Sequence, residues 1–263
     1  MSFFESVKNN RKLIIQLGKN EFKNKFANTS LGAIWGFVNP FIFMITYVIV
    51  FQYILKIGSS GDLPYIVWFL PGMAMWMFIN DSILSGSSSI RNYSYLVKKV
   101  VFPVEIIPVI SLCSSSIIGL FLIAISTIVC CIYGYIPNFI LLIYVIFAAY
   151  SLILSINRFT STICTIIPDF SQLLNVVMQL FFWFTPIIWN LNMLDGNDVL
   201  LNIMNCFPFT YLVNCIRNVF TGSNVIIGTN LIPTIVFWCF TIIVYVWGNA
   251  IFNKNRKDFA DVL

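Results

Sequence analysis

Apolar side chains form six long runs along the chain, separated by short polar segments. A helix needs about 20 mainly apolar residues to cross a hydrocarbon layer that is about 30 Å thick. We therefore predict an all-α, polytopic membrane protein that forms one transmembrane domain over residues 1–263, with the C-terminal residues 253–263 as a tail. The six predicted transmembrane helices cover residues 33–56, 65–90, 108–133, 138–160, 171–190 and 230–252.

The fifth run is the least regular of the six, because it is short and contains Pro186. A second apolar stretch follows it and is interrupted by Phe207-Pro208-Phe209. Non-helical backbone at membrane depth is stable only where it is buried in protein or lines water. We therefore expect residues 191–220 to form short re-entrant helices at the external face, covering a pore mouth.

The region before the first run, residues 1–30, has the pattern of an interfacial amphipathic helix. On a helical wheel of residues 3–17, Lys8 and Lys12 lie on one arc and the apolar side chains lie mostly on the other. The phase of the pattern changes near Gly18. We expect two joined helical pieces on the cytoplasmic leaflet, with a disordered basic tail as the alternative.

Composition and charge set the environment and the orientation. Apolar residues make up 59% of the chain and charged residues 10%, which is too few to coat a soluble domain of this size. Thirteen of the 15 Lys and Arg residues fall on the same side as the N-terminus, and only Lys56 and Arg217 fall on the other. Basic residues collect on the cytoplasmic side of membrane proteins. The pattern predicts a multi-pass protein of the plasma (inner) membrane with both termini cytoplasmic, and it explains the net charge of +5 without a nucleic-acid partner.

These 263 residues carry little that is typical of an enzyme or a metal protein. There is no histidine and no C-x-x-C pair among the seven cysteines, so we expect no metal site. Gly18-Lys19 lacks the other residues of a phosphate-binding loop, so we expect no ATP hydrolysis by this chain. Asp81 is the one ionisable residue clearly inside a predicted span. We expect it to make a structural hydrogen bond, with a transport role as the alternative.

Four motifs, in this order along the chain, resemble the ABC type-2 permeases that export polysaccharides and teichoic acids. Together the matches cover residues 3–259, which is essentially the whole chain. At one position this sequence departs from the family, which more usually has Asn where Phe207 stands. The four motifs are Leu31-Gly32 with Trp35, Asn39 and Pro40; the segment 91–108 with Phe102-Pro103 and Ile107-Pro108; residues 166–189 with Thr185-Pro186; and Phe207-Pro208-Phe209 with Tyr211 and Arg217.

The resemblance implies a homodimer around a central channel, with two copies of an ABC ATPase subunit bound below it. This chain would bind no cofactor, because ATP and Mg would be held by the partner ATPase. The implied substrate is a polysaccharide linked to undecaprenyl pyrophosphate, such as O-antigen or teichoic acid. Another cargo, such as a lipid or a drug, and a non-ABC scaffold for glycan assembly are the alternatives.

The resemblance also implies roles for two groups of residues. The cytoplasmic segment would dock on the ATPase, with a solvated charge run as the alternative, through Lys98, Lys99, Phe102, Pro103 and Glu105. The broken fifth span and the re-entrant segment would form an external gate containing Thr185, Pro186, Pro208, Tyr211 and Arg217.

Two further groups fit the chemistry of a lipid-linked glycan. Aromatic rings can pack on the apolar C–H faces of sugars; the candidates, which would otherwise face lipid, are Trp35, Phe37, Phe41, Phe43, Tyr47 and Phe51. A pyrophosphate needs cationic partners near the inner leaflet; the candidates are Lys23, Lys25 and Arg91.

Overall fold

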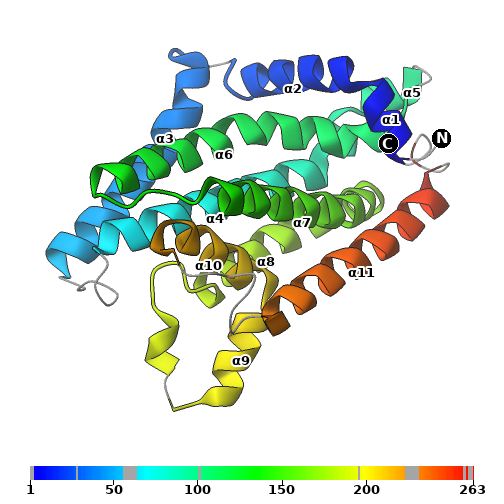
Figure 1. The fold of residues 1–263 in the computed structure, drawn as a ribbon. Helices are drawn as coiled ribbons and strands as arrows, with labels where there is room; N and C mark the ends of the chain where they lie inside the picture. Colours follow the sequence, from blue (N-terminus) through cyan, green and yellow to red (C-terminus); the bar gives the residue numbers. More distant parts are fainter. Residues whose placement is uncertain are drawn as a thin grey trace.

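The computed structural model describes residues 3–27, 29–55, 64–99, 102–194, 196–222, 231–256, 259 and 263, and every regular element in this part is a helix (Figure 1). The elements in chain order are α1(Phe3–Asn9), α2(Arg11–Lys25), η1(Gly32–Ile34), α3(Trp35–Val48), η2(Ile49–Ile54), α4(Tyr65–Asn92), α5(Ser94–Lys99), η3(Val104–Ile106), α6(Ile107–Ile132), α7(Phe139–Ile166), α8(Phe170–Phe184), η4(Leu191–Leu194), α9(Asp198–Cys206), α10(Pro208–Thr221) and α11(Leu231–Asn255).

Five of the six predicted spans are confirmed as helices that are long and apolar enough to cross a membrane. In the described part of the chain these are Gly32–Ile54, Tyr65–Lys98, Val104–Ile132, Phe139–Ile166 and Leu231–Asn255. The protein is therefore a multi-pass helical membrane protein. Both termini lie at one end of the bundle (Figure 1), which we call the termini end; the opposite end, where α6 is followed by α7, is the loop end.

The fifth predicted span is wrong in its C-terminal part, because α8 ends at Phe184. With 15 residues the helix is about 22 Å long, which is short for the hydrocarbon layer. The cause is Pro186, which disfavours helical backbone at the residue before it. Thr185 is accordingly extended, with φ −73° and ψ 129°, and the chain continues to Asn190 without a helix.

Helices α9 and α10 form the broken segment expected between residues 191 and 220, with an angle of 83° between their axes. The break lies at Phe207, which is extended because Pro208 follows it. Inside the bundle, α10 packs beside α4: Phe209 contacts Trp76, and Arg217 contacts Trp68, two turns closer to the loop end. We refer to α9 and α10 as the re-entrant pair.

The N-terminal region consists of two helices as expected, but the joint lies at Asn10 and not near Gly18. Gly18 is inside α2 and is buried against α6. A Cβ atom on Gly18 would lie 3.0 Å from the Cβ of Cys113, so the missing side chain allows α2 to approach α6 closely. Helix α2 therefore packs along α6 (Figure 1) instead of standing alone.

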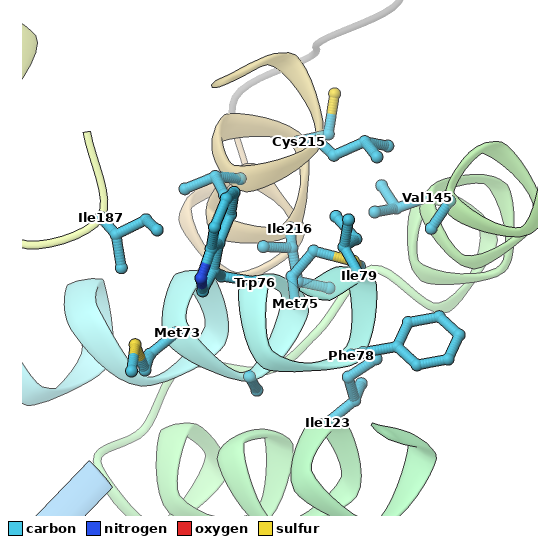
Figure 2. Close-up of a cluster of buried hydrophobic side chains, with 14 of the residues drawn as sticks. Met73, Met75, Trp76, Phe78, Ile79, Ile123, Val145, Ile187, Cys215 and Ile216 are labelled. Carbon is cyan, nitrogen blue, oxygen red and sulfur yellow. The ribbon is translucent and has the colours of Figure 1, made fainter. Parts of the chain in front are cut away.

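Helix α4 is the centre of the bundle, and most of its residues are buried. Its side chains contact α6, α7 and α10 (Figure 2). Phe78 occupies the space left by Gly119 of α6, where a Cβ would lie 2.1 Å from the ring. A second buried cluster at the termini end joins Ile90, Tyr93, Ile107 and Phe252.

The long helices exceed the membrane thickness, and their polar residues lie at the termini end. Helices α4 and α7 have 28 residues each, or about 42 Å, against about 30 Å for the hydrocarbon layer. When the length is counted from the loop end, the part of each helix that is longer than the hydrocarbon layer begins near Ser85 in α4 and near Asn157 in α7. Both of these parts are rich in polar residues. The bundle therefore extends beyond the hydrocarbon at its termini end.

Candidate functional site

Arg217 is the centre of a clamp on the break in the fifth span. Its guanidinium donates to the backbone carbonyls of Trp68 (Nε, 3.0 Å), Pro186 (Nη1, 2.7 Å) and Ile187 (Nη2, 2.9 Å). It also lies over the Trp68 ring, 3.6 Å from the centroid. Gly72 leaves room for the guanidinium, because a Cβ there would lie 3.1 Å from Nη2. The positive charge is thus compensated by carbonyl dipoles and an aromatic face.

The clamp makes the extended backbone after α8 stable at membrane depth. Unpaired carbonyls in this region would each cost free energy comparable to a lost hydrogen bond. Arg217 satisfies two of them, and the Trp189 indole donates to the carbonyl of Trp183 at 3.0 Å, near the end of α8. Sequence reasoning counted Arg217 as an external charge and missed this role.

The five predicted gate residues are all buried in this region of the structure. Tyr211 has a specific partner, because its hydroxyl lies 2.8 Å from that of Tyr144 on α7. Trp238 of α11 donates to the same Tyr144 hydroxyl at 3.0 Å, and the Tyr211 ring stacks on Phe237. The re-entrant pair is therefore attached to α4, α7 and α11. A role in gating remains a prediction.

The six aromatic candidates for glycan contact, which we call the aromatic track, lie on α3 and η2. They do not share one environment. Tyr47 and Phe51 join an aromatic cluster in which Tyr47 contacts Phe69 and Phe182. Phe37 packs on Phe22 and Phe121 instead.

Three of the track residues lie apart from this cluster. Phe41 and Phe43 are exposed by 42% and 59%. Trp35 lines a cavity of about 450 Å³ between α3, α4 and α6.

The aromatic cluster continues onto helices that sequence reasoning did not consider. From Phe182 on α8 it passes to Trp76 on α4 and then to Phe209 on α10, with ring centroids 5.8–5.9 Å apart. The aromatic content of α8 is visible in the sequence and could have indicated that this helix joins the cluster. The contacts themselves join segments more than 100 positions apart, so the spacing of residues along the chain does not reveal them.

Helix α8 also carries a polar stripe that is unusual for an apolar helix. Gln172, Asn175 and Gln179 are exposed and share one face, with Trp183 one turn further on. Asn175 donates to the carbonyl of Ser171 one turn earlier. Within the described residues, neither Gln172 nor Gln179 hydrogen-bonds to another helix. The opposite face is buried through Leu174 and Met178. We call Gln172, Asn175 and Gln179 the amide stripe.

Of the three head-group candidates, Lys25 is already paired. Its ammonium lies 3.7 Å from the Asp81 carboxylate and donates to the Ser85 hydroxyl at 2.9 Å. Asp81, the intramembrane carboxylate, therefore has a structural partner from α2. Lys23 and Arg91 are exposed and are the stronger candidates for an anionic ligand.

The predicted cytoplasmic segment 91–108, which we call the coupling segment, is connected to both ends of the chain through Glu105. This carboxylate is buried, accepts from Ser6 of α1 at 3.0 Å and pairs with Arg256, which follows α11. Glu105 thus faces its own chain, and the structure favours a bracing role over direct contact with a partner.

The other coupling residues are more accessible. Lys98 is exposed, while Phe102 and Pro103 are half-buried. The side chain of Lys99 lies outside the described residues. ATPase contact by these residues stays a prediction.

Arg158, one of the thirteen basic residues assigned to the cytoplasmic side, does not lie on the surface. It is buried between the rings of Phe3 and Phe252, with its guanidinium carbon 4.4 Å from each centroid. Its Nε donates to Asn249 at 2.9 Å. Arg158 therefore joins α1, α7 and α11 at the termini end.

The bundle, the clamped break and the re-entrant pair together form one multi-pass helical membrane domain. Residues 12–221 match the model of the ABC-2 type transporter family, and the chain belongs to that family. It is similar to the protein named O-antigen export system permease protein RfbA of Myxococcus xanthus, with 20% identity over 253 residues. It is also similar to two proteins of the same name from Klebsiella pneumoniae, with 23% and 22% identity. Each match covers 95% of both chains.

Proposed function

We propose that this chain is the permease subunit of an ATP-driven exporter that moves a polysaccharide linked to undecaprenyl pyrophosphate across the plasma membrane. Membership in the ABC-2 family supports transport, and the names of the relatives support a polysaccharide such as O-antigen as cargo. The energy source is ATP with Mg on a separate ABC ATPase. The termini end, which carries the coupling segment, is cytoplasmic.

The amide stripe on α8 is the observation that carries this proposal. Primary amides facing hydrocarbon would lose hydrogen bonds to water without a replacement. Gln172, Asn175 and Gln179 are exposed on the isolated chain, so their face favours a polar surrounding over acyl chains. A water-filled channel that carries a polyhydroxylated chain supplies it, because sugar hydroxyls donate to and accept from amides.

The same face combines the amides with an aromatic ring at Trp183. Aromatic rings pack on sugar C–H faces while amides bond the hydroxyls, and neither interaction selects one sugar unit. A surface of this kind lets a polymer slide. One chain encloses little space, so the channel lies between two copies of the chain with the α8 faces opposite one another.

The carrier pyrophosphate is the anionic end of this cargo. Lys23 and Arg91 bind it, because both are exposed cations near the termini end. Lys25 contributes less, since its ammonium is paired with Asp81. On the partner side, Lys98, Phe102 and Pro103 provide the accessible surface for the ATPase.

Co-purification with the ATPase encoded beside this chain tests the assembly. The complex is reconstituted in lipid nanodiscs, and ATP hydrolysis is compared between the wild type and a Phe102→Ala/Pro103→Ala variant. The expected result is a two-plus-two complex whose hydrolysis is uncoupled or lost in the variant. A folded chain that never binds the ATPase would contradict the proposal.

Cargo is tested separately in inverted membrane vesicles with radiolabelled lipid-linked glycan. ATP-dependent protection of the label from an external glycosidase is the expected result. A complex that hydrolyses ATP and binds the carrier but moves a different lipid would leave the permease assignment intact and overturn the cargo.

A further inference from the structure

An apolar groove runs along the outer side of α6 where it meets α7. It has a volume of about 510 Å³, and its walls include Val109, Cys113, Ile117 and Leu120 of α6 and Leu154 of α7. Two polar side chains also line it, but they are satisfied internally. The Tyr150 hydroxyl donates to Ser116 at 2.6 Å, and Ser116 donates to the carbonyl of Leu112 at 2.6 Å. The groove therefore offers an occupant an apolar wall.

The depth of the groove matches one leaflet of the membrane. Leu120 is 12 residues from the loop end of α6 at Ile132, or about 18 Å, and Val109 is about 34 Å from it. Since the hydrocarbon layer is about 30 Å thick, one end of the groove lies among acyl chains. The other end lies at the level of the lipid head groups.

A basic face of α2 lies beside the head-group end of the groove. Gly18 packs against Cys113, which lines the groove, and Lys19 is the next residue. Lys12, Lys19 and Lys23 are all exposed and share one face of α2, because they are seven and four positions apart. The exposed Ile15 lies between them. The carboxylate of α2 is directed elsewhere, since Glu21 accepts hydrogen bonds from Ser111 and Tyr93.

We propose that this groove is a binding site for an anionic phospholipid of the membrane. One acyl chain lies in the groove, Ile15 contacts the lipid near the glycerol level, and Lys12 and Lys19 bind the phosphate. An ammonium group near an anionic head group contributes about 1 kcal/mol, so charge complementarity selects an anionic over a zwitterionic lipid. The lipid bridges α2 to α6 and α7 and strengthens the packing at Gly18.

A resident phospholipid fits the site better than the carrier of the proposed cargo. The groove lies on a different face of α6 from the cavity lined by Ser115, Ile118 and Gly119, which faces α3 and α4. In the described part of the chain, none of its lining residues belongs to α8, which carries the amide stripe. The inference depends on the membrane location and not on the identity of the cargo.

Native mass spectrometry of the protein released from nanodiscs tests the site, using phosphatidylglycerol against phosphatidylcholine of equal chain length. The wild type is expected to retain phosphatidylglycerol selectively. Lys12→Gln/Lys19→Gln should lower that preference by roughly 30-fold, the effect of two ammonium groups. The matched control, Lys8→Gln/Lys254→Gln, removes two exposed lysines of the same end and should keep the preference.

A second variant, Leu120→Trp, tests the acyl-chain part of the site. Leu120 is 41% exposed, so the larger ring fills the groove without disturbing the core. It should reduce the retention of both lipids while the protein stays monodisperse in size-exclusion chromatography. Equal retention in all variants would overturn the site, as would a polyprenyl diphosphate as the retained ligand or a second copy of the chain covering the groove.

Discussion

Arg256, just beyond the last helix, pairs with Glu105 of the coupling segment, 151 positions earlier in the chain. Glu105 also accepts from Ser6 near the N-terminus. One buried carboxylate therefore connects the N-terminal helix, the coupling segment and the C-terminal end. A displacement of the coupling segment would be passed directly to α1 and to the end of α11.

The Glu105–Arg256 pair should show measurable coupling in a double-mutant cycle. Glu105 is buried, but the Arg256 side chain is 47% exposed, so solvent screening reduces the interaction. We expect a coupling free energy of about 1 kcal/mol between Glu105→Gln and Arg256→Gln. Unfolding of the purified protein in detergent measures it. In the control cycle, Lys254→Gln takes the place of Arg256→Gln, and its coupling free energy with Glu105→Gln should be close to zero. Equal coupling free energies in the two cycles would contradict a specific Glu105–Arg256 pair.

Replacing Arg217 should destabilise the break in the fifth span. Arg217→Lys keeps the charge but cannot reach the carbonyls of Trp68, Pro186 and Ile187 together. Each buried acceptor left unpaired costs about 1–3 kcal/mol, and the lysine ammonium can keep one of the three, so the total loss should be at least about 2 kcal/mol. Thermal unfolding in detergent checks this value. The exposed Asn202→Ala on α9 should change the stability little, and a similarly small effect of Arg217→Lys would show that the clamp is dispensable.

The sequence predicted the helices well because membrane spans are encoded locally by runs of apolar residues. It also signalled the two breaks, since Pro186 and Pro208 act on the residues directly before them. It could not predict where isolated charges are located. Arg158, Arg217 and Glu105 looked like surface charges, yet all three are buried. Their partners lie 30 to 151 positions away, and spacing along one chain holds no information on such pairs.

Glu21 should make the attachment of α2 sensitive to pH. Burial raises the pKa of this carboxyl above its ordinary value of 4.5, although Ser111 and Tyr93 donate to it. A folded-state pKa above the unfolded value means that the stabilisation is complete below pH 4.5 and is lost as the pH rises through the raised pKa. Wild-type stability should therefore decline with pH across this window more steeply than that of Glu21→Gln. Thermal unfolding at a series of pH values checks the slopes, and parallel curves would refute the prediction.

The amide stripe on α8 allows a comparison between neighbouring residues. Gln179 belongs to the stripe, whereas Leu180 is exposed by 52% on an adjacent face, which should contact lipid. If the stripe faces water and glycan, Gln172→Leu/Gln179→Leu should leave the folded protein stable and lower glycan export in vesicles several-fold. Leu180→Gln places an amide in hydrocarbon and should lower stability by about 1–3 kcal/mol. Export per folded complex and unfolding in detergent are measured for both variants. The opposite pattern would show that the stripe faces lipid, and the channel would then have to lie along another surface of the bundle.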